Sequence, residues 1–192
     1  MRLHPALLLT VAVSILISLP PANATPATSS DGHFVQHELV HDGRRFRYAV
    51  FVPAAAQPRP LPVVLFLHGS GERGSDGQAQ TTAGLGNWLR ANADRFPALV
   101  VFPQAPDDEE WMGDNARMAL ATLDAASAEF GGDPARTYAT GMSMGGYGTW
   151  EVALAAPDRF AALVPVCGGV RPPRAERPTL QVTAVAGEAD PY

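Results

Sequence analysis

Apolar and polar positions alternate with a period of two along the first clearly patterned part of the chain. Residues 34–40 and 45–52 are strand-like runs, and Asp42-Gly43 between them is typical of a type I′ hairpin turn. Residues 62–67 then form a continuous apolar run, as in strands that are buried on both faces of a parallel sheet. The pattern predicts an antiparallel hairpin followed by a buried strand.

Segments of helical composition alternate with apolar runs in the rest of the chain. The expected helices cover residues 82–92, 115–130 and 147–156, and the expected strands cover residues 98–102, 136–140, 160–166 and 180–185. Prolines at 172, 173 and 178 favour a loop before the last of these strands. This alternation predicts an α/β fold: a mostly parallel sheet with an antiparallel N-terminal hairpin and helices on both faces.

The first 24 residues have the pattern of a signal peptide. Arg2 precedes an apolar stretch over residues 6–19, and Ala22-Asn23-Ala24 is an A-x-A cleavage site. A membrane-spanning helix needs ~20 apolar residues, so no stable membrane anchor is expected, with an uncleaved anchor as the alternative. The pattern predicts a secreted or periplasmic protein, with a flexible lead over residues 25–32 and one domain over residues 33–192.

The charge and the composition exclude several classes of chemistry. The net charge is −5, and no basic stripe offers a surface for nucleic acid. All 14 basic residues are arginines, so neither a Ser-Lys dyad nor a lysine Schiff base is present. Cys167, the single cysteine, is expected to be buried and has no disulfide partner in the chain. Nothing in the sequence requires a metal or an organic cofactor.

The run Gly141-Met142-Ser143-Met144-Gly145 has the G-x-S-x-G form of a nucleophile elbow. In such an elbow a strained turn lifts the serine above the sheet, and small residues two positions before and after it let strand and helix approach closely. The run lies between an expected strand and an expected helix, which is the required order. The alternative is a chance match in a glycine-rich loop.

Several motifs taken together resemble one superfamily. The chain is similar to the α/β-hydrolases, and within them to the secreted esterases and predicted peptidases akin to feruloyl esterases, polyhydroxybutyrate depolymerases and prolyl-oligopeptidase-like hydrolases. The resemblance covers roughly residues 34 to 192. The motifs are His68-Gly69-Ser70-Gly71-Glu72-Arg73-Gly74, Phe102-Pro103-Gln104 with Trp111 beyond it, residues 141–150, and Pro157-Asp158-Arg159-Phe160.

The resemblance implies a role for each matching residue. Ser143 is the expected nucleophile, and the backbone N–H groups of Met144 and Ser70 are the expected oxyanion-hole donors. Asp190, in Gly187-Glu188-Ala189-Asp190, is the expected triad acid, with Glu188 or a plain surface turn as alternatives. Trp111 is expected to line the substrate pocket, with simple packing as the alternative. His68 is expected to be structural and to pack beneath the loop that follows it.

The general base of this arrangement is missing from the sequence. In these hydrolases a histidine follows the acid, but all five histidines of this chain precede Ser143. By analogy with subtilisin the loss is of order 10⁶ in turnover, so the chain is expected to be nearly inactive. The hairpin histidines at 33, 37 and 41 are expected to lie too far away to act as base, and too far apart along a strand to share one metal ion.

Three functions remain open on the sequence alone. The first is a serine hydrolase that cleaves a carboxylic ester, small or polysaccharide-linked, through an acyl-serine intermediate. The second is a prolyl-oligopeptidase-like serine peptidase, and the third is a non-catalytic binding protein on a hydrolase scaffold. Because the histidine is absent, we expect a C-terminally truncated member of the superfamily that lacks its usual last strand and helix.

Overall fold

The computed structural model describes residues 31–54 and 57–170. The predicted signal peptide, most of the flexible lead, the predicted strand over residues 180–185 and Asp190 therefore lie outside the described residues. The strands are β1 (His33–His41), β2 (Arg44–Val52), β3 (Leu61–Leu67), β4 (Leu99–Pro103), β5 (Gly132–Met142) and β6 (Ala162–Val166). The helices are α1 (Gly84–Ala91), α2 (Asp114–Phe130) and α3 (Met144–Ala155), with short 3-10 turns at Ser70–Glu72 and Ala79–Thr81.

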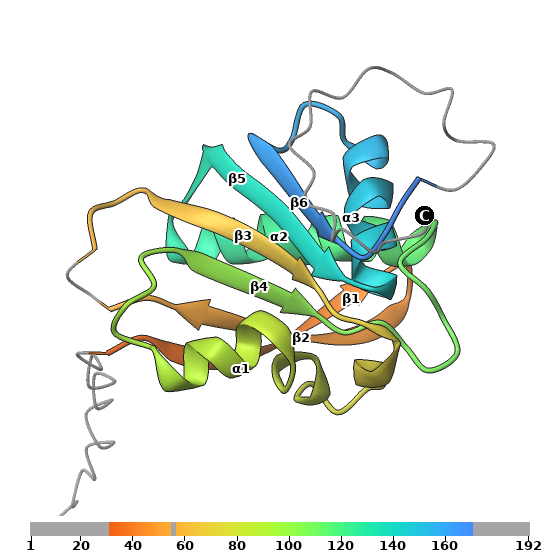
Figure 1. Cartoon of the computed structure of the whole chain (residues 1–192), viewed down its shortest axis with the longest axis horizontal. Helices are drawn as coiled ribbons and strands as arrows, with labels where there is room; N and C mark the ends of the chain where they lie inside the picture. Colours follow the sequence, from red (N-terminus) through yellow and green to blue (C-terminus); the bar gives the residue numbers. More distant parts are fainter. Residues whose placement is uncertain (1–30, 55–56, 171–192) are drawn as a thin grey trace, which may run out of the picture.

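The six strands form one sheet in the order β1-β2-β4-β3-β5-β6 (Figure 1). β2 pairs antiparallel with both β1 and β4, whereas β4, β3, β5 and β6 run parallel to one another. The hairpin turn between β1 and β2 has positive φ angles at Asp42 (48°) and Gly43 (76°), as a type I′ turn requires. The predicted mixed sheet with an antiparallel N-terminal hairpin is confirmed.

Two hydrophobic cores lie on opposite faces of the sheet, because successive strand residues point to opposite faces. On β2, Val50 joins the larger core, which contains Leu123 of α2 and Val152 of α3. Its neighbour Phe51 joins the smaller core, which contains Leu89 of α1. Helices α2 and α3 therefore cover one face and α1 covers the other, as expected (Figure 1).

The carboxyl ends of the four parallel strands meet at one edge of the sheet. His68 follows β3, Gln104 follows β4, Ser143 follows β5 and Cys167 follows β6. In open α/β sheets ligands bind outside these strand ends. Cys167 is exposed, so its expected burial is wrong: at this edge it lies beyond the last sheet residue rather than between layers. Among the described residues, no helix is both long enough and apolar enough to cross a membrane.

Candidate active site

Ser143 occupies a strained turn between β5 and α3. Its φ angle is +55°, a left-handed backbone conformation that serine rarely adopts. Its N–H donates to the carbonyl oxygen of Val166 on β6 (2.9 Å), and its own carbonyl accepts the N–H of Gly146 (2.8 Å). The residue is exposed to solvent although the turn around it is packed. This is the geometry that the sequence motif predicts for a nucleophile elbow.

The two glycines of the motif allow the elbow to lie close to β3. A Cβ atom at Gly145 would stand 1.8 Å from the carbonyl oxygen of Leu67, and one at Gly141 would stand 2.3 Å from the carbonyl oxygen of Gly145. Real Cβ atoms do not approach backbone atoms this closely. The backbone packing therefore excludes every larger residue at these two positions.

The loop after β3 comes close to Ser143. A Cβ atom at Gly69 would lie 3.9 Å from Cβ of Ser143, and Ser70 begins the 3-10 turn next to it. Met144 is the first residue of α3, so its N–H has no acceptor within the helix. The structure thus brings the segment carrying Ser70 to Ser143 and Met144, the three positions named from the sequence for nucleophile and oxyanion donors.

His68 is buried beneath this loop, with 2% of its surface exposed. Its Nε2 accepts the N–H of Ala105 (3.0 Å), and its Nδ1 lies 2.6 Å from the carbonyl oxygen of Gly69. The pKa of His68 is lowered to about 4, chiefly by burial; the hydrogen bond to Gly69 opposes this shift, and the nearby positive charge of Arg73 adds to it. The ring is therefore neutral at neutral pH with both nitrogens engaged, which confirms its structural role and removes it as a base for Ser143.

Trp111 is fully buried, with 1% of its surface exposed. Its Nε1–H donates to the carbonyl oxygen of His68 (3.0 Å), and its ring meets the His68 ring edge-on at 4.9 Å. It packs so closely on α3 that a Cβ atom at Gly148 would lie 2.4 Å from Cβ of Trp111. These contacts are those of a residue that supports the loop, and a direct contact with substrate stays a prediction.

Gln104, which belongs to a motif of the sequence but received no role there, binds the later part of the same loop. Its side chain accepts the N–H of Gly77 (2.7 Å) and donates to the Asp76 carboxylate (2.9 Å) and the Glu72 carbonyl (3.3 Å). Gln104 is 2% exposed. The signals in the sequence were its place in the Phe102-Pro103-Gln104 motif and directly after a buried strand.

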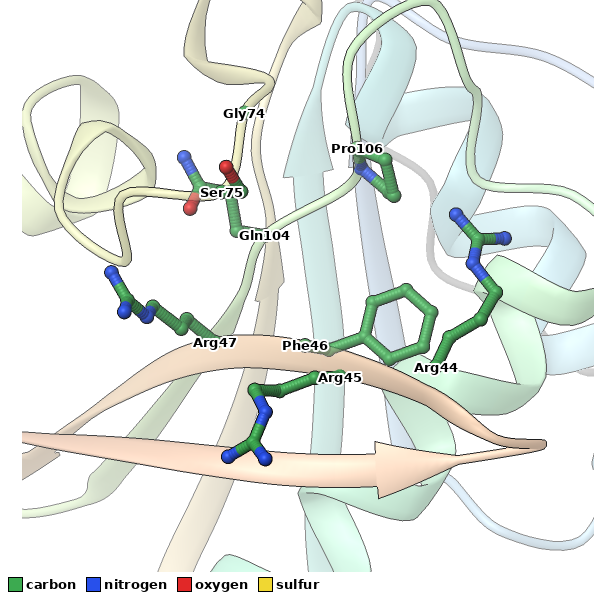
Figure 2. A pocket seen from close by; sticks show the side chains of 8 residues that line it. All are labelled: Arg44, Arg45, Phe46, Arg47, Gly74, Ser75, Gln104 and Pro106. Atoms are coloured by element: carbon green, nitrogen blue, oxygen red, sulfur yellow. The ribbon is translucent and has the colours of Figure 1, made fainter.

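A cavity of about 400 Å³ lies between the start of β2 and the loops that follow β3 and β4. Figure 2 shows Arg44 and Arg47 extending from β2 toward the side of Ser75 and Pro106, while Arg45 points away from them. Arg44 binds Glu109 (2.6 Å), and the pKa of that carboxyl is lowered as a result. The loop after β3 carries both Gly69, which lies beside Ser143, and the cavity residues Gly74 and Ser75.

The hairpin histidines lie far from Ser143. Three strands separate β1 from β5 in the sheet order, which at about 4.8 Å per strand places them roughly 19 Å apart. His37 packs on Tyr48, with ring centroids 5.1 Å apart, and His41 lies 3.5 Å from the carboxylate of Asp42. The expectation that these residues cannot serve as the base is confirmed.

Known proteins similar to this chain are esterases and a depolymerase. No protein-family model matches the chain. NocK of Nocardia uniformis subsp. tsuyamanensis, which has a provisional esterase assignment, is 29% identical over 206 residues, covering 91% of this chain and 58% of NocK. Poly(3-hydroxyalkanoate) depolymerase C of Paucimonas lemoignei is 31% identical over 129 residues, covering 60% of this chain and 30% of the depolymerase.

Solved structures similar to this chain include esterases as well. A thermostable esterase is 30% identical and superposes with a TM-score of 0.61, over 72% of this chain and 42% of that protein. A feruloyl esterase module from Clostridium thermocellum, complexed with sinapinate, has a TM-score of 0.59 at 17% identity, over 76% of this chain and 59% of the module, and so supports the fold alone.

The chain spans little more than half of NocK and less than a third of the depolymerase. The structure has the α/β-hydrolase fold, and the known proteins similar to the chain include esterases and a depolymerase.

Proposed function

We propose that this protein is a serine hydrolase that cleaves carboxylic esters through an acyl-Ser143 intermediate. The observation that carries the proposal is the exposed Ser143 at φ +55°, next to the first N–H of α3, which has no acceptor within the helix, and near the loop of Gly69 and Ser70. A purely structural protein has no need of this strained turn, so a non-catalytic role is disfavoured.

The proposed reaction has two steps. Oγ of Ser143 attacks the ester carbonyl carbon and the hydroxyl loses its proton, and the carbonyl oxygen takes the negative charge beside the N–H groups of Met144 and Ser70. The C–O bond to the alcohol then breaks, and the alcohol takes up a proton. Water then attacks the acyl-serine and releases the acid. Each oxyanion donor contributes about 3 kcal/mol of transition-state stabilisation. Asp190 remains the proposed triad acid.

We propose that the chain of 192 residues by itself hydrolyses esters slowly. Within these residues no histidine follows Ser143, and both ring nitrogens of His68 are engaged. The hairpin histidines lie on or next to the strand at the distant edge of the sheet. Without a base the hydroxyl loses its activation. In subtilisin-type hydrolases an oxyanion hole and substrate binding alone still leave a rate enhancement of ~10³–10⁴ over the reaction in water. Acylation by an activated ester is then slow, and the acyl group stays on the serine because deacylation needs the same base.

Esters rather than peptides are the proposed substrates, because the relatives are named as esterases and a poly(3-hydroxyalkanoate) depolymerase. The cavity beside the loop after β3 is lined by polar side chains, among them Arg44 and Gln104, and by the apolar side chains of Phe46 and Pro106. A small-molecule or polysaccharide-linked ester is the proposed substrate class. Export remains a proposal that the N-terminal apolar stretch and its A-x-A site support.

Protein mass spectrometry after incubation with p-nitrophenyl acetate tests the proposal. We expect a gain of one acetyl group, located on Ser143 by peptide mapping, and no gain in Ser143→Ala. Ser127→Ala is the matched control, because Ser127 lies on α2 and its hydroxyl donates to the Leu123 carbonyl of its own helix (2.7 Å). Equal labelling of the wild-type protein and Ser143→Ala would show that Ser143 is not the nucleophile.

A further inference from the structure

The orientation of the Ser70 N–H depends on the carbonyl group of the residue before it. The C=O of Gly69 and the N–H of Ser70 belong to one peptide unit, which is planar, and in its trans form the two groups point in opposite directions. Any contact that fixes the Gly69 carbonyl therefore also fixes the direction of the Ser70 N–H. This matters here because the proposed function uses that N–H as an oxyanion donor.

His68 provides the short contact to this carbonyl. Its Nδ1 lies 2.6 Å from the Gly69 oxygen, whereas the backbone N–H of Glu72 reaches the same oxygen at 3.4 Å. Hydrogen bonds weaken as they lengthen beyond about 3.2 Å. The imidazole, rather than the 3-10 turn, is the main restraint on the Gly69–Ser70 peptide.

The surroundings of the ring determine which nitrogen carries the proton. The N–H of Ala105, directly after Gln104, donates to Nε2 at 3.0 Å, so Nε2 must offer a lone pair. The proton of the neutral ring is therefore on Nδ1, where it can be donated to Gly69. The lowered pKa of His68 keeps the ring in this neutral form across the physiological range.

Trp111 holds the ring and its backbone in place. Its indole N–H bonds the His68 carbonyl (3.0 Å), and its edge-on contact restricts rotation of the imidazole. Trp111 is itself seated against α3, the helix that begins with Met144, where Gly148 leaves room for it. The two oxyanion segments are thus connected through one buried contact.

We propose that His68 is the positioning residue of the oxyanion hole: as the Nδ1–H tautomer selected by the Ala105 N–H, it orients the Gly69–Ser70 peptide so that the Ser70 N–H faces the reacting ester oxygen. Trp111 holds the ring in a fixed position relative to α3. The inference rests on the proposed function for its catalytic meaning, but the orientation itself is a structural property.

Two substitutions separate the two ring nitrogens. His68→Asn places an amide N–H near the position of Nδ1 and keeps the donor to Gly69, while it loses the acceptor for Ala105. His68→Gln reaches the position of Nε2 and keeps that acceptor, while it loses the donor to Gly69. A residue that only fills space would respond to both changes in the same way.

The residual dipolar coupling of the Ser70 N–H measures its direction without any activity. We expect His68→Asn to retain the wild-type coupling and His68→Gln to change it. In parallel, acetylation of Ser143 by saturating p-nitrophenyl acetate is expected to slow about 100-fold in His68→Gln, the effect of losing one oxyanion donor, with little change in the half-saturating concentration. His68→Asn is expected to keep most of the rate.

Several outcomes would overturn the proposal. An unchanged Ser70 coupling in folded His68→Gln, or equal loss of rate in both variants, would do so. Ring-nitrogen chemical shifts of the wild-type protein need no variant, and a proton found on Nε2 would exclude the mechanism even if both variants failed to fold. Absence of Ser143-dependent labelling in the wild type would instead refute the proposed function, and the coupling would still decide the role of His68.

Discussion

Acidification from pH 7 to pH 5 should destabilise this protein through His68. The folded pKa is about 4 against an ordinary value of 6.5, because the buried ring is kept neutral. Between these values the unfolded chain binds a proton that the folded chain does not, so stability rises with pH and is lost as the pH falls from about 6.5 to 4. The full separation corresponds to about 3 kcal/mol, of which about 2 kcal/mol falls between pH 7 and pH 5.

Urea unfolding at both pH values, compared between the wild-type protein and His68→Phe, measures this contribution. Phenylalanine keeps a ring against Trp111 but does not titrate, so its free energy of unfolding should fall about 2 kcal/mol less than that of the wild type. Carboxylates with a lowered pKa, such as Asp76, also lose stabilisation in acid, but they do so in both proteins. Equal losses, or an NMR titration of His68 with a midpoint near 6.5, would refute the reasoning.

Three further predictions concern the elbow, the core and the cavity. Gly145→Ala should lower the free energy of unfolding by roughly 3 kcal/mol or more, because its methyl group would meet a backbone oxygen. Gly71→Ala, with nothing within 4 Å, should change the free energy of unfolding by less than about 0.5 kcal/mol. Similar values for the two variants would contradict the packing argument. Leu123→Ala, at a position that is 0% exposed, should lower the free energy of unfolding by about 2–5 kcal/mol in urea denaturation, and a loss under about 1 kcal/mol would mean that the core there is loosely packed. A double-mutant cycle on Arg44 and Glu109, whose side chains are 49% and 38% exposed, should give a coupling energy of at most about 1 kcal/mol, and a larger value would point to a more rigid cavity wall than we infer.

Most of the secondary structure followed from local patterns. The hairpin, the strand over residues 62–67 and the helix over residues 115–130 were predicted within one or two residues of the observed bounds. Helix α2 ends at Phe130, and its C-cap residue Gly131 has a φ angle of +71°, the left-handed conformation typical of a glycine cap. Strand β5 is longer than predicted because pairing with β3, rather than residue preference, extends it past Pro134.

The candidate site was only partly predictable. The form G-x-S-x-G identified Ser143 and its two glycines because the constraint lies within five consecutive residues. The contact of Trp111 with His68, a residue 43 positions earlier in the chain, could not be read from the sequence, and its contact with substrate stays a prediction. Gln104 was part of a sequence motif but received no role, because its three partners are on a loop that approaches it only after β3 and β4 have paired.

The sequence by itself determined the α/β class, the order of its elements along the chain and the candidate nucleophile, Ser143. These properties depend on periodicity and on turn residues, which act over a few neighbours. Only the tertiary structure decided that β2 lies beside β4, that the hairpin histidines are out of reach of Ser143, and that His68 holds the Gly69 carbonyl through one ring nitrogen and the Ala105 N–H through the other. Those facts depend on distances between residues far apart in the chain, and such distances exist only once the sheet has formed.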